Sequence, residues 1–258
     1  MSKRKCWARD LGGCSDAISG EHIVTAGLFE TDVVAVQGFG WCRDEPKHVG
    51  LSSLTRNILC TKHNSTLSTV DSAAIAAFDV FRECVRLTDV RQSMAPRRWN
   101  ISHLKIDGLA LERWFLKTLI NVAIDGEQRI GPLSTLPGEP SQDLVRIGYG
   151  LAAFTGKAGL YAAAQVGETV TNEDRVNITS FLDASNERVL GGTFYFRGWR
   201  FVLYLDSCGL SPTVNVVHKD GHFEKMPPPI YHPRQIKFTV GGGISHVVDF
   251  DWRLHLKT

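Results

Sequence analysis

The spacing of the cysteines constrains this chain more than any other feature, since four of its six cysteines lie within the first 60 residues. These four are Cys6, Cys14, Cys42 and Cys60, and Cys60 is followed three positions later by His63. Two ligands at that spacing, at the start of a helix, can close on one metal ion. In a reducing compartment cysteines are more often thiols or metal ligands than disulfides. We therefore expect a metal ion to staple the N-terminal part of the chain.

The ligand set that we expect is Cys6, Cys14, Cys60 and His63. Three cysteines and one histidine form a normal set for structural zinc. Seven residues separate Cys6 from Cys14, which is more than a tight zinc knuckle uses, and Cys42 is an alternative to either of them. The competing interpretation needs no metal: Cys60 is a buried cysteine at a helix start, and His63 is a capping residue.

A second pair with chemical potential, Glu21-His22, lies between the two halves of the expected zinc site. A carboxylate can hold a divalent ion on a phosphate, and an imidazole titrates near neutrality and can accept a proton from water. In a strand the two side chains point to opposite faces, so only a turned backbone would bring both to one phosphate. The competing interpretation is an exposed glutamate beside a structural histidine.

The order of these motifs resembles a known family. Glu-His-Ile at 21–23, followed by Leu-Cys-Thr-Lys-His-Asn at 59–64, is similar to the HNH endonucleases. The resemblance covers about residues 6–75 and implies a ββα-metal fold braced by zinc. It also implies that His22 is the general base, and that Glu21 and Asn64 hold a catalytic Mg²⁺ or another divalent cation.

The chain departs from the family pattern in its middle and in its helix. Thr55 stands where the family has its middle asparagine, and the nearest candidate for that supporting role, Asn57, is two positions late. Ser68 stands at a further ligand position and is a poor ligand. Asp71 lies two helical turns after Asn64, roughly on the same face, and is an additional candidate ligand, directly or through water.

Hydrophobic periodicity predicts a long helix over residues 64–88, with apolar side chains at spacings of three and four. A break at Pro96 predicts a domain boundary there. We expect residues 1–96 to form the zinc-stapled ββα-metal module, and residues 97–258 to form a mixed domain that is rich in strands from about residue 172. The predicted fold class is α+β.

The second part of the chain contains a very apolar helix, predicted over residues 109–124. Arg113 and Lys117 share one face of it, and we expect both to lie on the solvated rim of a core helix. Crowded aromatic residues in the strands that follow are typical of a sheet core. This part carries no chemistry of its own that we can name. Target recognition, association with a second copy or a protein partner, and sensing all remain open for it.

The composition bounds the choice of function. A net charge of +2 is not that of a strongly basic nucleic-acid binder. The apolar stretches are too short to cross a membrane, and no apolar run follows the basic N-terminus, so we expect a cytoplasmic protein with no membrane partner. Two hypotheses follow: a metal-dependent endonuclease that hydrolyses phosphodiester bonds, in DNA rather than RNA, and a non-catalytic zinc-binding module that binds nucleic acid or a protein partner.

Overall fold

Helices and strands are mixed along the chain, as expected of an α+β protein. The structure, a computed structural model, describes residues 6–42, 44–95, 99–124, 126–163, 170, 173–207, 215–217, 223–225 and 229–253. The helices of this part are α1 (Thr61–Gln92), α2 (Gly108–Ala123) and α3 (Gln142–Gly148), with short 3-10 helices η1 (Arg9–Leu11), η2 (Ala26–Leu28) and η3 (Leu51–Ser53).

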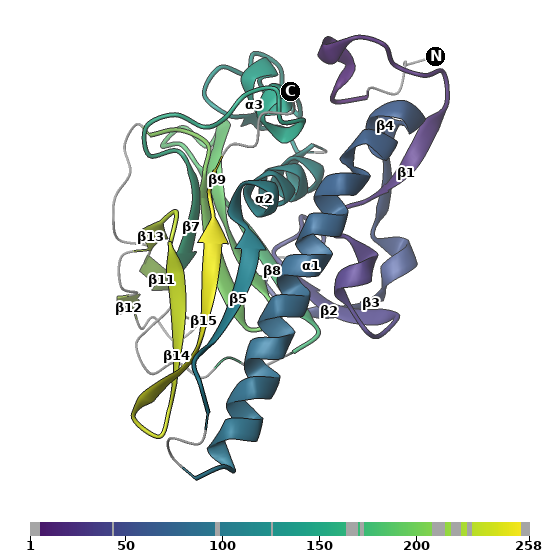
Figure 1. Ribbon diagram of the computed structural model, residues 1–258. Helices are drawn as coiled ribbons and strands as arrows, with labels where there is room; N and C mark the ends of the chain where they lie inside the picture. Colours follow the sequence, from purple (N-terminus) through teal and green to yellow (C-terminus); the bar gives the residue numbers. More distant parts are fainter. Residues whose placement is uncertain are drawn as a thin grey trace.

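The longest element, α1, confirms the helix that periodicity predicts over 64–88 and extends it at both ends. Cys60 caps its N-terminus, because the Cys60 side chain accepts a hydrogen bond from the backbone N–H of His63. Its buried face is the apolar stripe of the sequence, made of Leu67, Val70, Ala74, Ala77, Phe78 and Phe81. In Figure 1, α1 runs along the molecule, with α2 and β5 beside it.

The largest sheet has the strand order β13-β7-β10-β9-β8-β2-β3, with β6 paired to β9 outside this path. Within it, β2 lies parallel to β8, with Ala35 opposite Arg175. Strands from both sides of the predicted boundary after residue 96 therefore share one sheet. Its members are β2 (Val33–Gln37), β3 (Lys47–Gly50), β6 (Arg129–Ile130), β7 (Gly159–Ala163), β8 (Arg175–Leu182), β9 (Arg188–Phe196), β10 (Trp199–Tyr204) and β13 (Ile230–Tyr231).

The hydrophobic core also crosses that boundary. Phe81 of α1 stacks on Trp199 of β10, with ring centroids 4.2 Å apart. Trp114 of α2 contacts Phe78 of α1 at 5.7 Å and Phe196 of β9 at 5.1 Å. Such aromatic pairs bury large apolar areas and stabilise folds beyond the burial itself. The N-terminal half and the β-rich half are thus packed on a common core.

Smaller sheets complete the fold. Strands β1 (Ile18–His22) and β4 (Thr55–Cys60) pair antiparallel, and α1 follows β4 directly. A second sheet has the order β14-β15-β5, with β15 parallel to β5. Its strands are β5 (Ser102–Asp107), β14 (Gln235–Val240) and β15 (Gly243–Asp251), and the short strands β11 (Asn215–Val217) and β12 (Phe223–Lys225) form a separate pair.

Candidate functional site

The four expected zinc ligands meet at the junction between β4 and α1. Cys60 ends β4 and His63 lies in the first turn of α1. Cys6 and Cys14 flank the 3-10 turn η1, and the backbone N–H of Trp7 donates to the carbonyl of Ile58 over 3.1 Å, which ties this N-terminal segment to β4. Residues 57 positions apart therefore converge because the N-terminal segment folds back along the strand.

The distances within this Cys₃His group are those of a metal site. The Sγ atoms of Cys6, Cys60 and Cys14 lie 3.2, 3.3 and 3.5 Å from Nδ1 of His63. All four donor atoms lie within 4.8 Å of one another. A tetrahedral zinc with bonds of about 2.3 Å to sulfur and 2.0 Å to nitrogen separates these donors by about 3.5 Å. The group can hold one tetrahedral metal ion, and it is compatible with structural zinc.

Cys42, the alternative ligand, belongs elsewhere in the fold. Its thiol is buried and contacts the carbonyl oxygen of Val36 over 3.6 Å. The spacing in the sequence left this choice open, and the tertiary structure decides it in favour of Cys6 and Cys14.

The thiols of the Cys₃His group differ in acidity. Burial alone would raise the pKa of Cys60, but backbone N–H groups of His63 and Ser15 donate to its sulfur and bring the pKa down to about 6. Burial raises the pKa of the Cys6 thiol to about 12. Cys60 is therefore the thiol that most readily supplies a thiolate.

A contact from the second half of the chain holds this end of α1. The hydroxyl of Tyr149 donates a hydrogen bond to the backbone carbonyl of His63 over 3.1 Å.

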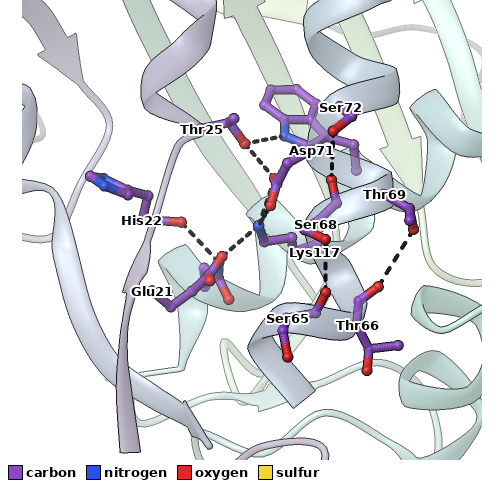
Figure 2. A network of polar contacts seen from close by, with 12 residues as sticks. Glu21, His22, Thr25, Ser65, Thr66, Ser68, Thr69, Asp71, Ser72 and Lys117 are labelled. Atoms are coloured by element: carbon purple, nitrogen blue, oxygen red, sulfur yellow. Dashed lines mark hydrogen bonds and ion pairs between the residues drawn. The ribbon is translucent and has the colours of Figure 1, made fainter. Parts of the chain in front are cut away.

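Glu21 and His22 point to opposite faces of β1, as Figure 2 shows. The side chain of Glu21 is only 3% exposed, and its Oε1 lies 2.5 Å from Nζ of Lys117, which is 2% exposed. The amide of Asn121 donates to the same oxygen over 3.2 Å. Burial raises the pKa of Glu21, while the ammonium of Lys117 opposes this shift. The Glu21 carboxylate thus faces α2 and the interior.

Asp71 of α1 reaches the same ammonium. Its two carboxylate oxygens lie 2.6 and 2.7 Å from Nζ of Lys117 (Figure 2). The hydroxyl of Thr25 donates to Asp71 over 2.5 Å and accepts from the indole N–H of Trp114 over 2.8 Å. Glu21, Asp71 and Lys117 come from three different elements, and we call them the ion-pair cluster.

The other positions singled out by the resemblance, which are Asn64, the supporting candidate Asn57, the departure Ser68 and the expected base His22, do not join this cluster. Asn64 donates from its amide to the hydroxyl of Ser19 over 2.8 Å. Asn57 is exposed on β4, and Ser68 is exposed and donates to the carbonyl of Ser65 over 2.8 Å. His22 is half-buried, and its Nδ1 atom is buried with no hydrogen-bond partner among the described residues.

This arrangement does not suit a catalytic divalent ion held by Glu21, Asn64 and Asp71. The two carboxylates are already bound to an ammonium, and the amide of Asn64 bonds Ser19 instead. Hard oxygen donors are what Mg²⁺ prefers, but two of the three expected donors are engaged by a resident cation. The Cys₃His group and the expected catalytic ligands therefore differ in how well each fits its metal.

Sequence reasoning missed Lys117 as a member of this site. We expected it on a solvated rim of its helix, and that expectation is wrong, because Lys117 is among the largest fully buried side chains. Asn121, one turn later on α2, is also fully buried. The signal that could have identified both is their place in a nearly continuous apolar run, LALERWFLKTLINVAI, where a charged side chain needs a buried partner.

Comparisons with known proteins add no relatives. No family model, no curated protein and no solved structure matches this chain. Among the described residues, no helix has both the length and the apolar character needed to cross a membrane.

Proposed function

We propose that Cys6, Cys14, Cys60 and His63 hold a structural zinc ion. The observation that supports this most directly is the approach of three sulfur atoms to one histidine nitrogen at 3.2–3.5 Å. Four protein ligands fill a tetrahedral shell and leave no open position for substrate, which is the pattern of structural rather than catalytic zinc. The ion would join the N-terminal segment, the end of β4 and the start of α1.

Elemental analysis of the purified protein tests this proposal. We expect about one zinc per chain in the wild type, since one complete ligand set binds one ion. Cys60→Ser should lose it. Cys84→Ser is the matched control, because Cys84 is another buried cysteine that lies on α1 outside the group. Equal zinc in both variants, or none in the wild type, would exclude the site.

For the unit formed by β1, β4 and α1, which the proposed zinc joins to the N-terminal segment, we propose a binding role without catalysis. Its architecture of strand, strand and helix agrees with the resemblance to HNH endonucleases, which makes nucleic acid the first partner to test. The observation that carries the non-catalytic assignment is the bidentate contact between Lys117 and Asp71, together with the contact of Lys117 to Glu21. Two carboxylates that already contact a buried lysine ammonium are not free to hold a divalent ion on a phosphate.

A metal-dependent endonuclease acting on DNA is the second candidate, and one observation favours it. Nδ1 of His22 is buried without a partner among the described residues, and the imidazole lies on the face of β1 opposite Glu21. Buried polar atoms are almost always hydrogen-bonded, so an orphaned imidazole nitrogen is a sign of a functional role. A neutral histidine in that position can accept a proton from an attacking water.

Two assays on the zinc-loaded protein separate the candidates. One measures plasmid nicking with Mg²⁺ or Mn²⁺, and the other measures DNA and RNA binding by mobility shift. We expect binding without metal-dependent nicking, and equal binding by the wild type and His22→Ala. Nicking by the wild type that is lost in His22→Ala would overturn the non-catalytic assignment. Failure to bind either nucleic acid would leave a protein partner as the ligand of the module.

A further inference from the structure

The ammonium of Lys117 occupies the point where two carboxylates converge. It lies 2.5 Å from Glu21 Oε1, and 2.6 and 2.7 Å from the two oxygens of Asp71. The three hydrogen atoms of an ammonium suffice for these three contacts. In Figure 2, Lys117 enters from α2 and ends between the residues of β1 and α1.

The groups that support this arrangement are neutral. Asn121 donates to Glu21, and Thr25 donates to Asp71. Without the lysine, two carboxylates from different elements would face one another at close range in a buried site, where their repulsion is weakly screened. A cation is therefore required at this point.

We propose that Lys117 is the resident cation of a site that would otherwise bind a divalent metal ion through Glu21 and Asp71. In the wild type the ammonium fills the site permanently, because it is covalently attached and fully buried. Replacing it by an uncharged side chain turns the ion-pair cluster into a site for a hard divalent cation such as Mn²⁺ or Mg²⁺. This inference goes beyond the proposed binding role and does not depend on nucleic-acid binding or cleavage.

The geometry indicates how an ion would enter and what would hold it. The side chain of Asp71 is 22% exposed, so the site opens to solvent on the α1 side. The carboxylate oxygens of Asp71 and Glu21 supply hard donors, and water completes the shell of such ions. Mn²⁺ is the suitable probe, since thiolate sites favour softer metals and the Cys₃His group should keep its zinc.

The experiment is a titration of zinc-loaded, full-length protein with Mn²⁺, read by the electron paramagnetic resonance signal of the free ion. Lys117→Met should bind one equivalent at least about tenfold more tightly than the wild type, because a positive charge has been removed from the binding point. Lys117→Arg, which keeps the charge, should bind like the wild type. Lys117→Met combined with Asp71→Asn should lose the gained site.

Several outcomes would overturn the proposal. Wild-type protein that binds Mn²⁺ as tightly as Lys117→Met would show that the lysine does not fill the site. A folded, zinc-loaded Lys117→Met protein that binds no Mn²⁺ would show that the carboxylates do not form one.

A measurement on the wild type covers the case in which Lys117→Met does not fold. Nitrogen-15 NMR detects ammonium protons only when their exchange with water is slow. Slow exchange is expected for a buried Nζ that donates three hydrogen bonds. A slowly exchanging ammonium signal that is absent in Lys117→Arg supports the proposal, and fast exchange of every lysine ammonium contradicts it. All of these readouts are independent of the nicking assay, so failure of the nuclease candidate and failure of this inference are distinguishable.

Discussion

The Cys₃His group and the ion-pair cluster both include a residue of α1, and they draw on the paired strands β4 and β1 respectively, but they satisfy their charges in opposite ways. The first gathers soft sulfur and nitrogen donors from residues 6–63, and the cation that we propose for it comes from outside the chain. The second gathers hard oxygen donors from β1 and α1 and receives its cation from Lys117 on α2. The proposed zinc ion would bind the first group from solution, whereas folding itself brings the lysine ammonium to the second.

This difference teaches where each site is vulnerable. A metal ion can be removed by a chelator, whereas a covalently attached ammonium cannot. Conversely, Lys117→Met removes the ammonium without changing any of the four proposed zinc ligands. Each site can therefore be tested by a change to which the other is insensitive.

The largest effect should come from zinc removal. A strong chelator should unfold the junction between β4 and α1, because structural zinc contributes roughly 10–16 kcal/mol of apparent binding free energy in small zinc domains. Thermal unfolding followed by circular dichroism measures this loss. Cys84→Ser should still be stabilised by zinc, as the wild type is. A melting curve unchanged by chelation would remove the distinction between the two sites.

Lys117→Met should be the most damaging single substitution in the ion-pair cluster. Breaking a buried ion pair leaves charge without a partner and costs roughly 3–5 kcal/mol of unfolding free energy. Denaturant unfolding at neutral pH measures it, and adding Glu21→Gln to the same chain should restore part of the loss.

The matched control for Lys117→Met is Arg129→Met, because Arg129 pairs with Glu187 at 2.9 Å on the surface. Exposed ion pairs contribute about 0–1 kcal/mol. Equal losses for the two variants would mean that burial of Lys117 has no energetic consequence.

Thr25→Val should have a smaller effect of the same kind. The hydroxyl of Thr25 links Asp71 to the indole of Trp114, and valine keeps the shape while removing both hydrogen bonds. We expect a loss of about 1–2 kcal/mol of unfolding free energy, since the indole N–H is then buried without an acceptor. Thr69→Val, on the exposed face of α1, should change little. A Thr25→Val protein as stable as the wild type would remove Thr25 from the support of the cluster.

The smallest effect should be a change in the pH dependence of stability. Burial raises the pKa of Glu21 above its unfolded value, so the folded state binds this proton more tightly than the unfolded state. The stability that this group contributes is therefore fully present below the unfolded pKa, and it is lost as pH rises through the raised folded pKa. Glu21→Gln should lack this decline, as measured by denaturant unfolding at a series of pH values. Parallel curves for the two proteins would contradict the assignment of the shift to Glu21.

Several parts of the fold could be predicted from local patterns. The apolar stripe that ends at Phe81 predicts α1, and Cys60 and His63 mark its start. The strands from Arg175 to Tyr204 follow from runs of β-forming residues around the turn at Arg197-Gly198, where both residues have positive φ. These features depend on neighbours in sequence, so periodicity and turn chemistry are sufficient to find them.

The division into two halves at residue 96 shows where such patterns stop. Pro96 indicates a break there, but β2 pairs with β8 and Phe81 packs on Trp199 across the predicted boundary. Pairing between strands 140 residues apart leaves no local mark on either strand, since a buried strand reads the same whichever neighbour it has.

By itself, the sequence identified Cys60 and His63, three residues apart at a helix start, as one half of a metal site, and it left Cys6, Cys14 and Cys42 as candidates for the other half. Only the tertiary structure decided that Cys42 is excluded, that Glu21 faces inward, and that Lys117 joins it. The physical reason is the same in each case. The residues that a buried side chain contacts depend on which helices and strands pack next to it. That packing brings together residues far apart in the sequence, so local patterns do not reveal it.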